Sequence, residues 1–428
     1  MGRATREEAD KNETEKLALE TAGEVFPDGA AIELVANPSA GVNQLALLLW
    51  DREKVRVAPK IEHRGQAYRP IPLHETIRRA VRLPSDAVGD GSMSPLLTEL
   101  AGLIEQYIFL PKPESFTAAV WCLSTWLADL LSSPPCLLLS GPDMDLAVKL
   151  FRLMHSLCRR PLLLADISPS RVRTLPTRLR PTLLVNQPVL SPGIRALWRS
   201  SNYKGFVVPG NGGVLLDIVG SKAVFTALEN PTDDWADSVI HLALPQGRRE
   251  PLLSDTELVQ IANRLQPRLL MFRLRNFVDV NKSGPIPSRL NLPAFIQENS
   301  HFVETVIPLL QRQEQDAVLC RGCDVKVALV EVLWDVSHTE VEIAVSKLTA
   351  LTNCLLRCRG ETIAYRAEEI GWRLKALGLY RHRDGDGMQL RFSREHRLRI
   401  HQAVQQFGLV LPPKDGCPDC TSPDAVAR

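Results

Sequence analysis

The feature that most constrains the fold is a series of short apolar runs that alternate with helical patterns through the middle of the chain. One segment between the runs, 145–158, places Leu146, Leu150, Phe151, Met154 and Leu157 on a single helical face. Continuous apolar strands separated by helices indicate a parallel sheet covered on both faces. The sequence therefore predicts an α/β core whose strands are 136–140, 161–165, 181–186, 222–228 and 238–244.

The regions around this core differ from it in composition. The first residues are rich in Glu, Lys and Thr, and prolines cluster at Pro285, Pro287 and Pro293. These features predict a flexible tail over 1–24, a small α+β unit over 25–110, the core over 111–280 and a Pro-rich linker over 281–300, then a helical domain over 301–412 and a second tail over 413–428.

The helical domain has a recognisable order of elements. We expect helices over 325–336, 340–356 and 367–377, and the last helix stops naturally at Gly378. Two strands, 380–383 and 388–392, flank the turn Asp384-Gly385-Asp386-Gly387. Three helices followed by a hairpin predict a winged helix-turn-helix.

The bulk composition excludes several classes of protein. The 428 residues are 45% hydrophobic and 23% charged, as in ordinary globular domains, and the net charge is only +2. A nucleic-acid function would therefore depend on a local basic patch. The most apolar stretch, 116–131, contains Ser124, Thr125 and Asp129, so we expect a buried helix and no membrane span. Nine irregularly placed cysteines favour a reducing, cytoplasmic setting.

The loop between the first strand and its helix stands where a phosphate-binding loop belongs. A working loop needs glycines, a Lys for the outer phosphates and a Ser or Thr for magnesium. This chain has Gly141 and Pro142, but Ala147 stands at the glycine position, Val148 at the lysine position and Lys149 at the hydroxyl position. Asp143 and Asp145 bring negative charge to the place of a triphosphate, and either could cap the helix instead.

A second nucleotide-site element is altered in the same way. The strand 181–186 ends in Asn186 and Gln187, where an Asp-Glu pair would hold magnesium and polarise water. The two amides are nearly isosteric with the acids, but they are uncharged and cannot act as a base. We therefore expect neither ATP nor magnesium to be a cofactor.

Residues 134–244 resemble the P-loop ATPase domain of phage- and plasmid-type primase–helicase proteins. The resemblance rests on the helix around Trp121 and Trp126, the phrase Arg159-Arg160-Pro161, the loop 166–169 and the strand 181–185. It implies a P-loop fold of replication or mobile-element ancestry, with degenerate Walker A and Walker B motifs. The family's nucleotide-sensing Arg is matched here by Asp237.

The predicted winged helix carries a local excess of positive charge. Its third helix contains Arg373 and Lys375, and the hairpin contains Arg381, Arg383 and Arg391. In such domains one helix enters the major groove while other residues contact phosphates. These side chains are our candidates for binding double-stranded DNA, and packing or homo-oligomer assembly is the alternative use of the same domain.

Cysteine pairs at metal-ligand spacing occur twice. Cys320 and Cys323 form one pair, and Cys417 and Cys420 form another within a Pro/Gly-rich tail. The second pair resembles a zinc knuckle and is our candidate metal site, with free thiols as the alternative. Cys354 and Cys358 fall on one helical face, where we expect core residues.

Three functions remain open from the sequence. The first is a catalytically inactive ATPase-like protein that binds DNA or a protein partner through its C-terminal domain. The second is an active ATP-dependent helicase or motor with atypical motifs, in which Lys149 is recruited to phosphate. The third is a scaffold that mediates only oligomeric assembly.

Overall fold

In the computed structural model, the apolar runs in the middle of the chain form one parallel five-stranded sheet. The strands lie in the order β14-β8-β13-β10-β9, so β8 is flanked by the two strands of this sheet that come last in the sequence. Their bounds are β8 Cys136–Ser140, β9 Pro161–Leu164, β10 Thr182–Asn186, β13 Lys222–Thr226 and β14 Val239–Ala243. The predicted α/β core with a parallel sheet is confirmed.

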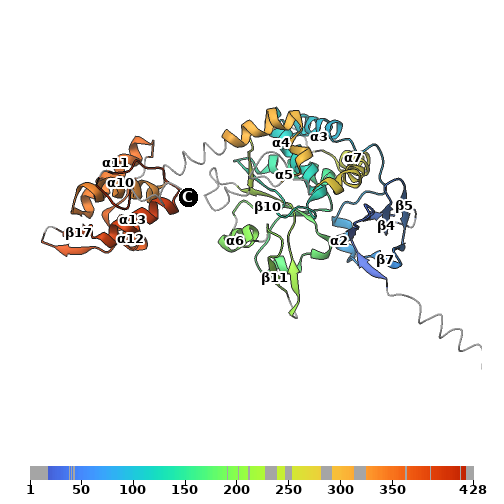
Figure 1. The fold of residues 1–428 in the computed structure, drawn as a ribbon. Coiled ribbons are helices and arrows are strands. Elements are labelled where there is room, and N and C mark those ends of the chain that lie inside the picture. Colours follow the sequence, from blue (N-terminus) through green and yellow to red (C-terminus); the bar gives the residue numbers. More distant parts are fainter. Residues whose placement is uncertain are drawn as a thin grey trace, which may run out of the picture. The chain divides into compact units, whose positions relative to one another are not determined.

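The chain divides into two compact units, Met1–Gln311 and Arg312–Arg428 (Figure 1). The structure describes residues 18–37, 39, 41, 44–189, 191–200, 202–210, 213–226, 239–245, 253–280, 292–312, 324–361, 364–385, 387–414 and 416–420. None of the helices within these ranges combines the length and apolar character that a membrane span requires.

Alternate residues of the sheet face two different hydrophobic clusters. Leu137 and Leu139 of β8 belong to a cluster with helices on one side, whereas Leu138 belongs to a second cluster on the other side. This alternation follows from the two-residue period of a strand. The helices on the first side are α3 Met93–Ile108, α4 Lys112–Ser124, α5 Met144–Leu157 and α7 Asp255–Asn276.

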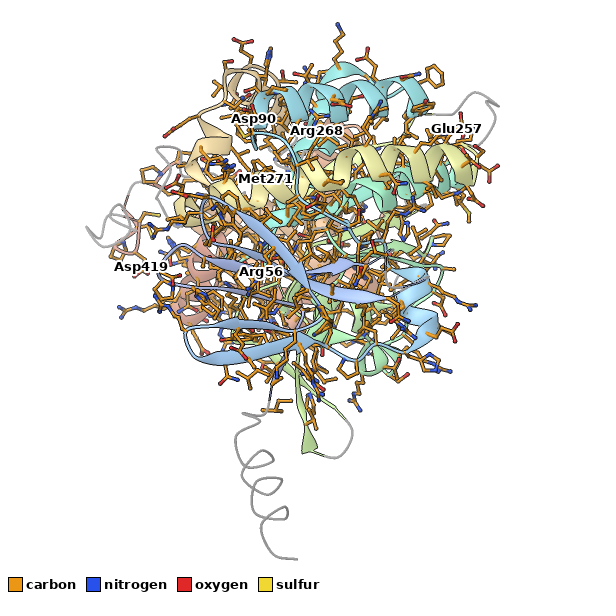
Figure 2. The ribbon with its side chains drawn as sticks, turned by 90° about the vertical axis from the view of Figure 1, so that its right-hand side faces the viewer. Arg56, Asp90, Glu257, Arg268, Met271 and Asp419 are labelled. Atoms are coloured by element: carbon orange, nitrogen blue, oxygen red, sulfur yellow. The ribbon has the colours of Figure 1, made fainter. Side chains whose placement is uncertain are left out.

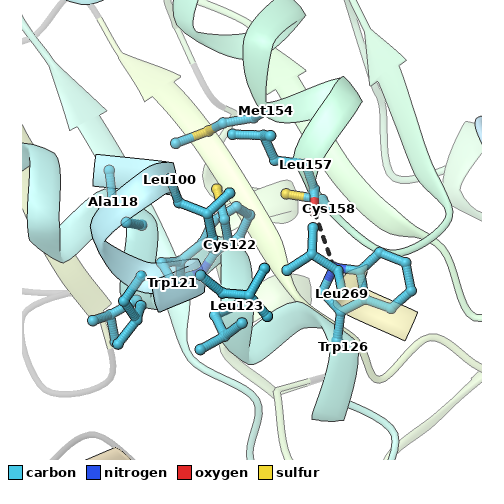
Figure 3. Packing of buried hydrophobic residues seen from close by; sticks show 14 of the residues in the cluster. Leu100, Ala118, Trp121, Cys122, Leu123, Trp126, Met154, Leu157, Cys158 and Leu269 are labelled. Carbon is cyan, nitrogen blue, oxygen red and sulfur yellow. Dashed lines mark hydrogen bonds between the residues drawn. The ribbon is translucent and has the colours of Figure 1, made fainter. Parts of the chain in front are cut away.

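Two tryptophans anchor the helical layer. Trp121 and Trp126 are fully buried, in a cluster with Leu100 of α3, Leu157 of α5 and Leu269 of α7 (Figure 3). Each indole nitrogen donates to a backbone carbonyl: Trp121 to Pro135 O at 2.9 Å and Trp126 to Leu157 O at 2.9 Å. The apolar stretch predicted as a buried helix is therefore the centre of this layer.

The N-terminal segment adds two small sheets to the same unit. The four strands β2 Gly23–Val25, β3 Ala31–Ala36, β4 Leu45–Trp50 and β5 Val55–Ala58 form an antiparallel sheet. A second sheet contains β1 Leu19–Thr21, β7 Gln66–Pro70 and β6 Ile61–His63. Residues of β3 and β4 alternate between both hydrophobic clusters of the core, so the segment predicted as a small separate unit shares the core of the first unit.

A buried cluster of charges joins these sheets to the helical layer. Glu33 of β3 accepts hydrogen bonds from Arg159, Arg160 and Arg273 at 2.9, 2.7 and 2.5 Å. Asp129 accepts from Arg273 at 2.7 and 2.8 Å and lies 3.3 Å from Arg159. Burial alone would raise the pKa of Glu33, but the charges of the three arginines outweigh it and hold that pKa below its usual value.

Several further segments complete the first unit. The loop around Asp90 runs beside α7 near Arg268 and Met271 (Figure 2), and Asn276 of α7 donates to Gly91 O. Helix α7 begins with a capping box made by Ser254 and Glu257. The other elements are α2 Glu75–Ala80, α6 Pro192–Ser200, β11 Val207–Pro209, β12 Leu215–Asp217 and α8 Ala294–Gln297.

The boundary between the units differs from the predicted linker. Residues 281–291 lie outside the described residues, but Ile296, Phe302 and Val306 are buried in the first unit's core. The division therefore falls after Gln311, because the segment that follows the prolines carries apolar residues that pack on α4.

The second unit has its own hydrophobic core. Its elements follow the order α10 Val325–Thr339, β15 Glu342–Ala344, α11 Val345–Cys358, α12 Ala367–Ala376, β16 His382–Asp384, β17 Gly387–Arg391 and α13 Arg394–Gln406. The strands form an antiparallel sheet in the order β15-β17-β16. Three helices and a hairpin are present as predicted, but the second predicted helix begins later, because Ile343 is extended and pairs with Leu390.

Candidate functional site

The loop after β8 is closed against a neighbouring segment. Gly141 has φ +151°, and a Cβ added there would lie 2.6 Å from Leu244 O, so the position requires glycine. The Leu244 amide also donates to Ser140 O at 2.6 Å. Pro142 is exposed beyond this contact. The glycine of the loop therefore allows close packing on the chain that follows β14.

The first turn of α5 is capped by a carboxylate of the protein itself. Asp143 is the N-cap residue, and its Oδ1 accepts a hydrogen bond from the Leu146 amide at 2.9 Å. Asp145 lies exposed in the same turn. The sequence left open which acid would cap the helix, and the structure has Asp143 in that role. The Leu146 amide is therefore already satisfied by a carboxylate of the chain itself.

The next motif positions are part of the helix packing. Ala147 is fully buried in the core of the first unit. Val148 and Lys149 are half-buried on α5. Consecutive helical residues differ in direction by about 100°, so Lys149 does not take the direction that the motif gives its lysine.

The end of β10 holds a neighbouring loop in place. Gln187 Oε1 accepts a hydrogen bond from the Ile167 amide at 3.1 Å, which ties the loop after β9 to the end of β10. Asn186 Oδ1 is buried, and within the described part of the chain it has no hydrogen-bond partner. Gln187 thus makes a contact within the protein. Asp237, predicted in place of the sensing Arg, lies outside the described residues.

A Ser–His contact that the sequence did not predict joins two neighbouring strands, β8 and β14. Ser140 Oγ lies 2.6 Å from His241 Nε2 of β14. Burial lowers the pKa of His241, which favours the neutral imidazole. Because Ser140 is only 2% exposed, its hydroxyl is closed to a substrate and the pair acts as a link between strands.

The candidate DNA-binding residues of the second unit differ in their exposure to solvent. Lys375, Arg383 and Arg391 are exposed. Arg373 is half-buried: its guanidinium lies 4.9 Å from the Tyr365 ring centroid, and its Nη1 donates to Glu369 O at 3.0 Å. Arg373 is therefore less open to solvent than a residue on an exposed helix face.

Two further side chains shape this surface. Arg381 is half-buried and packs over Gly371 of α12, where a side chain would collide with its guanidinium. Trp372 and Tyr380 are 63% and 64% exposed, which is unusual for large aromatic residues. The surface of α12 and the hairpin thus combines exposed aromatic rings with separate positive charges.

Cys417 and Cys420 lie next to two histidines that the sequence analysis did not single out. The ligand atoms of His338, His401, Cys417 and Cys420 all lie within 4.8 Å of one another, and all four residues are half-buried. His338 is near the end of α10, and His401 is on α13. A distance of 63 residues separates the histidines in the chain, so no local spacing signals the group.

The other cysteines do not join this group. Cys354 and Cys358 were expected in the core, but both are exposed on α11. Leu348, Thr352 and Leu356 form the buried side of that helix instead. Cys320 and Cys323 lie outside the described residues.

Comparisons with known proteins give only distant likenesses. No family model matches the chain, and no curated protein matches its sequence. Among solved structures, the apo structure of the NrS-1 C-terminal region (305–718) has 9% identity and a TM-score of 0.37. An A-form apo structure of the same region has 10% identity and a TM-score of 0.36. Both alignments cover 84% of this chain and 96% of the other. These likenesses are too distant to bear on function.

Proposed function

We propose that this protein is a non-hydrolysing P-loop-type protein of replication or mobile-element ancestry that binds double-stranded DNA through its second unit. The absence of ATP hydrolysis is inferred from the Asp143 carboxylate, which caps the N-terminus of α5. A triphosphate would need the same backbone amides and would be repelled by that charge. Val148 stands at the lysine position, and Lys149, one residue later on the helix, differs from it in direction by about 100°.

The order of elements in the second unit supports the DNA-binding half. A helix, a strand, two helices and a hairpin follow one another from α10 to β17, as in a winged helix-turn-helix. In that arrangement α12 would enter the major groove and the β16–β17 hairpin would contact the backbone. Gly378 ends α12 with φ +73°, which turns the chain directly into the hairpin.

The side chains on these elements suit a nucleic acid. Trp372 and Lys375 are exposed on α12, and Tyr380 and Arg383 are exposed on the segment that follows. Lysine and arginine neutralise phosphates, and exposed aromatic rings add contact area. Exposed Glu368 and Asp384 oppose phosphate, so we expect modest affinity with a strong dependence on salt.

The hairpin supplies an internal control. Arg383 pairs with Met388, whereas His382 pairs with Gln389, so Arg383 and Arg391 project from opposite faces of the hairpin. If one face meets DNA, only one of the two arginines contacts phosphate. Arg56, exposed on β5 of the first unit (Figure 2), is a matched arginine in a different unit.

The experiment is fluorescence anisotropy of the full-length protein on random-sequence duplexes across a salt series. We expect Lys375→Ala and Arg383→Ala each to weaken binding and to flatten the log–log salt slope by about one unit. Arg56→Ala should leave both unchanged, and so should Arg391→Ala, because Arg391 projects from the other face of the hairpin. Absence of binding at about 50 mM salt would refute the DNA proposal and favour a role in protein assembly.

The same protein preparation tests the proposal that the chain does not hydrolyse ATP. ATP turnover should stay at background with and without duplex DNA. Magnesium-dependent turnover that disappears in Lys149→Ala would instead establish an atypical motor.

A further inference from the structure

Four side chains in the second unit present metal-ligand atoms to a common point. The Nε2 atoms of His338 and His401 lie 3.2 Å apart. Cys417 Sγ lies 3.6 Å from His401 Nε2, and Cys420 Sγ lies 3.5 Å from His338 Nε2 and 3.9 Å from His401 Nε2. These residues come from α10, α13 and the segment after α13, so the fold and not the local sequence brings them together.

The distances agree with the edges of a tetrahedron around zinc. Zn–N bonds of about 2.0–2.1 Å and Zn–S bonds of about 2.3 Å, set at tetrahedral angles, place two nitrogens about 3.3 Å apart and a nitrogen and a sulfur about 3.6 Å apart. The nitrogen pair and all three nitrogen–sulfur pairs given above fall within a few tenths of an ångström of these lengths. A site held by four protein ligands is of the closed, structural kind.

The surroundings of His338 fix the form in which it would bind a metal. Its Nδ1 lies 2.6 Å from Trp334 O. A carbonyl oxygen can only accept, so Nδ1 carries the hydrogen and Nε2 presents its lone pair to the other three ligands. A histidine that donates its second nitrogen to a backbone carbonyl is the usual arrangement around protein-bound metals.

The chain around the two cysteines is also held in place. Trp334 packs against both imidazoles, with ring centroids 4.8 and 4.5 Å apart, and its Nε1 donates to Pro412 O at 3.2 Å. Lys414 Nζ lies 2.7 Å from Asp335 of α10. The Cys420 amide donates to Cys417 O at 3.2 Å, which makes the tight turn of a Cys-x-x-Cys ligand pair.

We propose that His338, His401, Cys417 and Cys420 bind one Zn²⁺ and that this ion fastens the C-terminal segment to α10 and α13. Thiolate and imidazole ligands select zinc over magnesium or calcium, which prefer oxygen. On binding, the two thiols release their protons to solvent, and the sulfurs and the Nε2 atoms donate electron pairs to the metal. The inference is independent of DNA binding and of the nucleotide site.

The test is metal analysis of the full-length protein, purified under reducing conditions, loaded with Zn²⁺ and then dialysed. We expect one zinc per chain. The Cys417→Ser/Cys420→Ser double variant should lose it, and His338→Gln or His401→Gln should each weaken zinc binding by more than tenfold. The matched control, Cys354→Ser/Cys358→Ser, removes two exposed cysteines and should keep the full zinc content.

Two further measurements keep the proposal open to refutation if a variant fails to fold. Co²⁺ added to the wild-type protein should give the intense d–d bands of a tetrahedral site together with a thiolate charge-transfer band. A Cys320→Ser/Cys323→Ser variant should retain both. Wild-type protein that holds no stoichiometric zinc, octahedral cobalt bands, or zinc kept by the Cys417→Ser/Cys420→Ser variant would each overturn the proposal.

Discussion

Two clusters of polar side chains, one in each unit, are assembled from distant parts of the chain but differ in how their members are satisfied. In the first unit, the carboxylates of Glu33 and Asp129 receive hydrogen bonds from arginines of opposite charge. In the second unit, one imidazole nitrogen each of His338 and His401 and the sulfurs of Cys417 and Cys420 lie within 4.8 Å of one another. A cluster of opposite charges holds a fold together, whereas a cluster of imidazole and thiol ligand atoms is suited to a cation. The cap on α5 belongs to the first kind, because the Asp143 carboxylate accepts a hydrogen bond from a backbone amide of the same helix.

The largest effect is expected on removal of Glu33, the acceptor that the three arginines share. Glu33→Ala should lower the free energy of unfolding of the first unit by about 3–5 kcal/mol, because it leaves buried arginines without their partner. Chemical denaturation followed by tryptophan fluorescence measures the change. Glu62→Ala, an exposed glutamate on β6, should stay within about 0.5 kcal/mol of the wild type. An equally small effect of Glu33→Ala would mean that the cluster does not support the fold.

Acid should act on the same cluster. The folded-state pKa values of Glu33 and Asp129 are lower than their unfolded values, so the stabilisation is present above the unfolded pKa, near pH 4. It is lost as the pH falls from there through the folded-state values. Glu33→Gln should therefore be less stable than the wild type at pH 7, and the difference should narrow below about pH 4.

The α5 cap gives a smaller effect. Asp143→Ala should destabilise the first unit by about 0.5–2 kcal/mol, because the Leu146 amide loses its acceptor. Asp145→Ala removes a charge from the same turn without removing the cap, and should cost about 0.3–1 kcal/mol. Thermal melts with and without ATP and magnesium complete the test. Stabilisation of the wild type by ATP would contradict the view that the acid has replaced the phosphate.

The smallest effect is expected at Arg373 in the second unit. Its guanidinium stacks on Tyr365, so Arg373→Ala should cost about 0.5–1 kcal/mol of stability. Lys375 is exposed, so Lys375→Ala should instead leave stability unchanged, weaken DNA binding and flatten its salt dependence. Thermal melts of the two variants, compared with their anisotropy titrations, distinguish a residue that stabilises the fold from one that contacts DNA. A large loss of DNA affinity in Arg373→Ala without loss of stability would place this arginine on the DNA.

The sequence predicted the parts of the fold in which a strong local pattern coincides with burial. All five residues of β8 are buried, and the apolar run gave its bounds directly. β15 was missed, because its three residues are extended only through pairing with β17. α13 was also missed: Ile400, Ala403 and Val404 are its buried residues, too few among arginines and polar residues to give an apolar period.

The candidate sites show the same difference between features with a local sequence pattern and features that depend on tertiary contacts. The position of the loop between β8 and α5 could be predicted, because both flanking elements have strong local patterns; the altered nucleotide motif in that loop stays a prediction. Cys417 and Cys420 were found from their spacing, but His338 and His401 were not. The histidines come together with the cysteines only when α10 packs on α13, and no short sequence pattern predicts a contact between two distant helices.

The strand order of the central sheet has a consequence for synthesis of the chain. β8 pairs with β13 and β14, which begin only at Lys222 and Val239, so the ribosome releases the apolar run 136–140 well before either partner exists. Pairings between distant segments form late and leave unpaired strands exposed to aggregation. A nascent chain stalled between β8 and β13 would therefore be the species most in need of a chaperone.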